Sequence, residues 1–103
     1  MGAADERTGL NVGLCIFSLH LPGIGSLKQK RQILRSIQDR LRGQHNVAVA
    51  EIDHQNLWQR ATLGVVCIAS ARAPLERIFE SIQREVERRV PGEVLDSHVE
   101  FLS

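Results

Sequence analysis

The chain has 103 residues, of which 43% are hydrophobic and 24% charged, and its formal net charge at pH 7 is +1. This length suits one domain with its own core, and this composition excludes an intrinsically disordered chain. Aromatic residues make up only 4% of the chain, so aliphatic side chains must fill the core and few rings are available to stack on bases.

The first nine residues are small and polar and include Asp5, Glu6 and Arg7, without the apolar run of a signal peptide. They predict a disordered N-terminal tail over residues 1–9, followed by a single domain over residues 10–103. No stretch approaches the eighteen or so apolar residues that a membrane-spanning helix needs. We therefore expect a cytoplasmic protein without a membrane partner.

Hydrophobic periodicity predicts six elements in the order strand, helix, strand, strand, helix, strand. They are expected over residues 11–21, 27–41, 47–53, 61–70, 74–90 and 94–102. Ser26 is a predicted helix cap, and Gly43 and Pro91 are predicted stop signals. In the last strand the alternation predicts that Leu95 lies on the same side as Val99 and Phe101.

This order predicts an α+β fold, the ferredoxin-like βαββαβ sandwich. Right-handed crossovers place both helices on one face of a four-stranded antiparallel sheet. The first and third strands are the most apolar, so we expect them at the centre of the sheet. The second and fourth strands have polar ends or strict alternation, which is typical of edges.

Two segments extend this prediction. LPGIGSLKQKRQILRSI (residues 21–37) and NVAVAEIDHQNLWQRATLGV (residues 46–65) resemble the hallmark stretches of the YlxP-like family of bacterial proteins of unknown function. The resemblance covers roughly residues 10–100 and implies a ferredoxin-like domain without an established catalytic residue. The genes of this family often lie near those for translation initiation and for ribosome-binding factor A. By association, the resemblance implies a role in translation or ribosome maturation.

The predicted first helix is strongly basic. Lys28, Arg31, Arg35 and Arg42 share an arc of roughly 60° on a helical wheel. Lys30 falls within the apolar arc, where we expect its stem to be buried and its ammonium to reach solvent. The second helix instead balances four glutamates against four arginines. An unbalanced cationic stripe favours phosphate binding, although an ordinary solvated surface explains it too.

The loop Asp53-His54-Gln55-Asn56-Leu57-Trp58-Gln59-Arg60 is the second candidate site. Trp58 could stack on a base and Arg60 could form a forked contact with a phosphate. The alternative is structural, because Asp53 is a good turn former and Trp58 is the largest apolar side chain available to a core with few aromatics. For Trp58 we favour the structural role at the edge of the core. His54, Gln55 and Arg60 are harder to explain by packing.

No pattern predicts a catalytic, metal or cofactor site. Cys15 and Cys67 lie in apolar strands, which is typical of buried thiols; a disulfide is the less favoured alternative. Glu51 and Asp53 share a side of a predicted strand, and His20 or His98 could approach them from another strand. His54 points to the other side, however, and no nucleophile accompanies the carboxylates. The sequence therefore predicts a non-enzymatic protein with no metal and no cofactor.

The sheet face without helices is the last candidate surface. Its central strands contain only Phe17 as an aromatic, so base stacking on the sheet is not favoured. An aliphatic face favours pairing of two copies instead. The leading hypothesis is thus a binding protein for RNA or the small ribosomal subunit, acting through the first helix. The alternative is a homodimeric protein-interaction module, joined through the open sheet face and without a nucleic-acid role.

Overall fold

A computed structural model describes residues 10–102 of the chain. Its elements are β1 (Asn11–His20), α1 (Leu27–Gln44), β2 (Val47–Asp53), β3 (Arg60–Ala69), α2 (Arg72–Arg89) and β4 (Glu93–Phe101). The expected tail over residues 1–9 lies outside the described residues, so the division of the chain into a tail and one domain stays a prediction. No helix within the described range is both long enough and apolar enough to cross a membrane.

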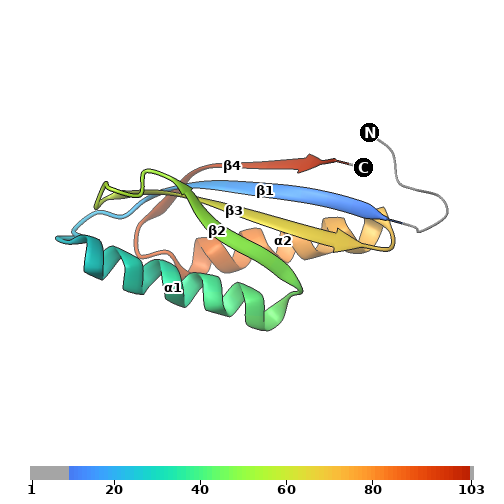
Figure 1. Ribbon diagram of the computed structural model, residues 1–103, viewed down its shortest axis with the longest axis horizontal. Coiled ribbons are helices and arrows are strands. Elements are labelled where there is room, and N and C mark those ends of the chain that lie inside the picture. Colours follow the sequence, from blue (N-terminus) through green and yellow to red (C-terminus); the bar gives the residue numbers. More distant parts are fainter. Residues whose placement is uncertain (1–9, 103) are drawn as a thin grey trace.

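The four strands form one antiparallel sheet in the order β2-β3-β1-β4, and both helices cover the same face of it (Figure 1). The predicted ferredoxin-like βαββαβ sandwich is therefore confirmed. The central pair is β1 and β3, as their apolar composition indicates. Ladder hydrogen bonds on both sides of these two strands leave β2 and β4 at the edges.

The core lies between the sheet and the two helices. Alternate residues of β1 face it, with Cys15, Phe17 and Leu19 fully buried, while the intervening residues turn to the open face. Gly13 belongs to the same buried series, near the start of β1. A side chain there would overlap the ring of Phe79 from α2, so the glycine allows the helix to approach the strand.

Helix α1 begins with two reciprocal hydrogen bonds. Ser26 Oγ accepts one from the Gln29 backbone N–H at 3.1 Å, and the Gln29 side chain accepts one from the Gly25 N–H at 3.0 Å. The pattern is close to a capping box and confirms Ser26 as the cap. The helix continues through Gly43 to Gln44, beyond the predicted end. Buried Leu41 anchors this last turn, and its packing outweighs the roughly 1 kcal/mol that glycine costs in a helix.

The prediction for Leu95 was wrong. The pairing of β1 with β4 shifts between Ser18 and Leu19, so that Ser18 lies opposite Asp96 and Leu19 opposite Val94. The bulge inserts Leu95 as an extra residue and leaves it exposed, while Val94 packs against the core. Strict alternation holds only after the bulge.

Both cysteines are free and buried, on the neighbouring strands β1 and β3. They are not directly opposite, because Cys15 pairs with Val65 and Cys67 with Gly13. Burial raises the pKa of the Cys15 thiol to about 12 and also raises the pKa of Cys67. Both are therefore protonated, unreactive core thiols, as the apolar sequence around them predicts.

Candidate nucleic-acid interface

Three of the predicted cations come together along the side of α1 that faces β2. Arg31, Arg35 and Arg42 line a shallow groove of about 330 Å³ between this helix and Glu51 of the edge strand. Lys28 is exposed one helical turn before Arg31. We call the surface formed by Lys28, Arg31, Arg35 and Arg42 the basic flank.

The cations of the basic flank differ in their partners. Lys28, Arg31 and Arg35 are exposed, and no side chain of the three forms a hydrogen bond or an ion pair with any residue between 10 and 102. Arg42 instead donates to the Val49 carbonyl of β2 at 2.9 Å and lies 3.4 Å from Asp39. Arg42 therefore ties the end of α1 to the edge strand, and its charge is shared with a carboxylate.

Lys30 does not reach solvent, so the expectation for this residue was wrong. It is 1% exposed, and its Nζ lies 2.7 Å from Glu51 Oε2. The same ammonium donates to the carbonyl oxygens of His54 at 2.6 Å and Leu57 at 2.7 Å. The ammonium thus has one carboxylate and two carbonyl oxygens within 2.7 Å, and partners of this kind are the condition under which a lysine can be buried. Lys30 joins the two motif stretches that are far apart in the sequence.

The loop between β2 and β3 is ordered by its own hydrogen bonds as well. His54 adopts a left-handed backbone conformation (φ 61°), and its N–H donates to the Asp53 side chain at 2.8 Å. The Leu57 N–H closes a turn onto the His54 carbonyl at 3.1 Å. His54 Nδ1 and Thr62 Oγ1 share a hydrogen bond at 3.0 Å, and the Gln55 side chain donates to the Glu51 carbonyl at 3.3 Å. These contacts give Asp53, His54 and Gln55 structural roles within the loop.

Trp58 does not cap the core, so the favoured structural role for it was wrong. Its side chain is half exposed, at 51%, and neighbouring Leu57 is equally exposed. Trp58 and Arg60 line a shallow hollow of about 390 Å³ formed by residues 56–60. Arg60 is half-buried at the start of β3, and its Nε has no hydrogen-bond partner within the described range. The loop lies at the same end of the molecule as the start of α1 (Figure 1).

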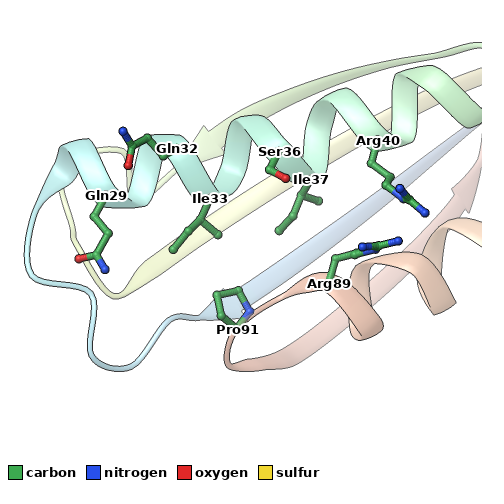
Figure 2. A pocket seen from close by; sticks show the side chains of 8 residues that line it. All are labelled: Gln29, Gln32, Ile33, Ser36, Ile37, Arg40, Arg89 and Pro91. Atoms are coloured by element: carbon green, nitrogen blue, oxygen red, sulfur yellow. The ribbon is translucent and has the colours of Figure 1, made fainter.

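The opposite side of α1 faces α2 and has a different electrostatic character. Figure 2 shows the groove there, of about 490 Å³, with Arg40 from α1 and Arg89 from α2 reaching toward one another. Both arginines donate through Nε to one oxygen of Glu85, at 2.8 Å and 2.9 Å, and Arg88 donates to the other oxygen at 3.0 Å. We call Glu85 with these three arginines the interhelix cluster.

Glu85 is buried, and its pKa is lowered from the ordinary value. The hydrogen bond from Arg40 is the largest cause of this shift, and Arg89 and Arg88 add to it against the opposing effect of burial. A carboxylate therefore already binds these guanidinium groups. They are less suited to phosphate contacts than the unpaired cations of the basic flank.

The remaining polar residues do not converge. His20 lies 3.6 Å from Glu93, and His98 lies 4.0 Å from Glu100, both at the exposed surface. Glu51 is bound to Lys30 instead of facing a histidine. Within residues 10–102, no group of three or more His, Cys, Asp or Glu side chains could hold a metal ion.

The sequence interpretation missed the link from Lys30 to the loop and the link from Arg42 to β2. A signal for the first was present, because a lysine inside an apolar helical arc needs buried acceptors. Glu51 and the loop carbonyls were available in the second motif stretch. The pattern of one helix could not show which residues on another element would supply those acceptors.

Comparisons with known proteins agree with the sequence resemblance. A family model described as "Protein of unknown function (DUF503)" matches residues 12–99. The uncharacterised protein YlxP of Bacillus subtilis (strain 168) is 36% identical over 58 residues, which are 56% of this chain. The match spans 63% of that relative's length.

Two solved structures with some similarity to this chain have low sequence identity to it. A mutant of SnoaB, described as a cofactor-independent oxygenase from Streptomyces nogalater, has a TM-score of 0.48 at 7% identity, covering 92% of each chain. A dimeric ferredoxin-like protein from an uncultured marine organism has a TM-score of 0.44 at 11% identity, covering 91% of this chain and 88% of its own. At these TM-scores and identities, the similarity says nothing about side chains or function.

Proposed function

The chain belongs to the DUF503 family of unknown function, and we propose that it is a non-enzymatic protein that binds the phosphate backbone of structured RNA through the basic flank. Lys28, Arg31 and Arg35 supply the phosphate contacts in this proposal. Arg42 holds the groove in shape, and Arg60 lies beside the loop. The family's association with translation genes favours ribosomal RNA, and hence a role in the cytoplasm in translation or ribosome maturation.

One observation supports this proposal above the others. Three exposed cations lie along one side of α1 without a carboxylate partner among the described residues, whereas Arg40 on its other side shares Glu85 with an arginine of α2. Unpaired, solvent-accessible cations can neutralise phosphates, and the cations condensed on the nucleic acid are then released, which drives binding. An overall net charge of +1 would hide such a local surface.

The test is binding to ribosomal RNA fragments and to small ribosomal subunits across a salt series. The wild type is compared with an Arg31→Gln/Arg35→Gln double variant, and the matched control is Arg77→Gln/Arg84→Gln. The control removes the same charge from two exposed positions, seven residues apart, on α2. We expect affinity to fall with salt and the slope of log K against log[salt] to lose about one unit per lost phosphate contact in the α1 variant only. Equal slopes in both variants, or no binding, would overturn the proposal.

A second candidate function rests on the open face of the sheet. Ile68 of β3 is 61% exposed and Ile52 of β2, which packs over Gly64, is 50% exposed. Val66 lies between them on the same face and is also exposed. We infer from this aliphatic surface a homodimer with the two sheet faces packed together. Sedimentation of the wild type as a dimer at micromolar concentration, and of Ile68→Lys as a monomer, would support it; a monomeric wild type would exclude it.

A further inference from the structure

The tip of the loop between β2 and β3 presents an indole to solvent. Trp58 is 51% exposed and Leu57 beside it is 50% exposed, so two large apolar side chains are adjacent at the surface. An indole contributes more to stability when buried than most side chains do, so its exposure in a chain with so few aromatics is unusual. The other side chains of the loop after Asp53 are polar or cationic, with no acid: His54, Gln55, Asn56, Gln59 and Arg60.

The side chain of Lys30 anchors the backbone next to this indole. Its ammonium binds the carbonyl oxygen of Leu57, the residue directly before Trp58, at 2.7 Å. The second contact, to the His54 carbonyl, holds the other end of the turn that the Leu57 N–H closes. On the far side of Trp58, the Gln59 carbonyl accepts a hydrogen bond from the Leu21 N–H at 2.8 Å. The backbone is thus anchored on both sides of an exposed ring, which reduces the conformational entropy lost when the ring binds.

The charges around the loop indicate the kind of ligand. Lys28 and Arg31 lie on α1 within two residues of Lys30, so unpaired cations of the basic flank begin where the loop is anchored. A cationic surface next to an aromatic side chain is the combination that proteins use for unpaired nucleotides, since every base has a face that can stack. The amides of Asn56 and Gln59 beside the ring can hydrogen-bond to base edges.

We propose that Trp58 stacks on an unpaired nucleobase of an RNA whose backbone lies along the basic flank. The ligand class is then an RNA stem with a bulge or loop, and a fully paired duplex is the weaker ligand. This inference rests on the function proposed above and adds to it the structural feature that is recognised.

The chain contains one tryptophan and no tyrosine, so its intrinsic fluorescence reports on Trp58 directly. The wild type is titrated with an RNA stem that contains a two-adenine bulge and with the same stem fully paired. We expect the bulged RNA to quench the emission and to bind about tenfold more tightly, while the paired stem binds without quenching.

A Trp58→Leu variant separates stacking from general hydrophobic contact, because leucine keeps an apolar tip but has no aromatic face. We expect this variant to bind the bulged and paired stems equally, with the salt slope of the wild type. A Trp58→Phe variant should keep part of the preference. If Trp58→Leu retains the full preference for the bulged stem, the contact is a general hydrophobic one and the stacking inference is wrong.

The two proposals fail in different ways. If the wild type binds both stems equally and without quenching, and Arg31→Gln/Arg35→Gln still lowers the salt slope, stacking is overturned and backbone binding stands. If neither stem shows salt-dependent binding, both proposals are overturned. Circular dichroism of each variant confirms that the fold is retained.

Discussion

The two sides of α1 carry similar cations in different surroundings. On the side facing α2, Arg40 of α1 converges on Glu85 with two arginines of α2. On the side facing β2, Arg31 and Arg35 have no ion-pair partner among residues 10–102, and Arg42 binds a backbone carbonyl. The comparison shows that a cation's role follows from the acceptors that another element supplies. The helix sequence alone does not determine it.

The largest effect is expected from Lys30, the one lysine of α1 that is buried. Lys30→Met should lower the free energy of unfolding by about 3–5 kcal/mol, because it leaves Glu51 and two loop carbonyls without their partner. Urea denaturation measures the loss. The matched control is Lys28→Met at an exposed position, which should change stability by no more than about 0.5 kcal/mol.

A double variant sharpens this prediction. Adding Glu51→Gln to Lys30→Met removes the unpaired carboxylate and should restore part of the lost stability. If Lys30→Met is no more destabilising than Lys28→Met, the buried network does not hold the loop.

A smaller effect is expected from the interhelix cluster, because its arginines are 41–67% exposed and solvent screens them. Glu85→Gln should lower stability at neutral pH. The pKa of Glu85 is lowered from 4.5 in the folded state, so its stabilisation is complete above pH 4.5 and is lost as the pH falls through the lowered value. The difference between wild type and variant should therefore shrink below pH 4.5 in denaturation curves. A difference that stays constant with pH would contradict the ion-pair role.

The smallest effects on stability are expected within the basic flank, where Arg42 binds a backbone carbonyl and Arg35 does not. Arg42→Met should cost about 1 kcal/mol, since the Val49 carbonyl loses its side-chain donor. Arg35→Gln should leave stability within about 0.5 kcal/mol and act on RNA affinity instead. Thermal unfolding of both variants measures the contrast. Equal losses would show that Arg35 also has a structural role.

The fold could be predicted from the sequence because its signals are local and repeated. Apolar periodicity gave the element order, and the continuous apolar runs of β1 and β3 indicated the centre of the sheet. The candidate site was predicted less well. The stripe at Lys28, Arg31 and Arg35 follows from helical geometry, whereas the partners of Lys30 and Arg42 depend on how α1 packs against β2.

Two errors have a common physical cause. Leu95 was placed on the same side of its strand as Val99 and Phe101 by alternation, which a single bulge interrupts. Trp58 was assigned to the core edge by size, but the anchored backbone of its loop leaves the ring half exposed. In both cases a local backbone irregularity overrides a rule based on the side chain.

The contacts of Lys30 also bear on the order of folding. The ammonium binds carbonyls 24 and 27 residues further along the chain, so the loop cannot acquire these bonds until α1 has docked beside β2. A hairpin made of residues 46–69 alone would lack the donor that holds the loop in shape. The anchored form of the loop therefore depends on tertiary packing, and the backbone beside the exposed tryptophan gains this support only when α1 has docked.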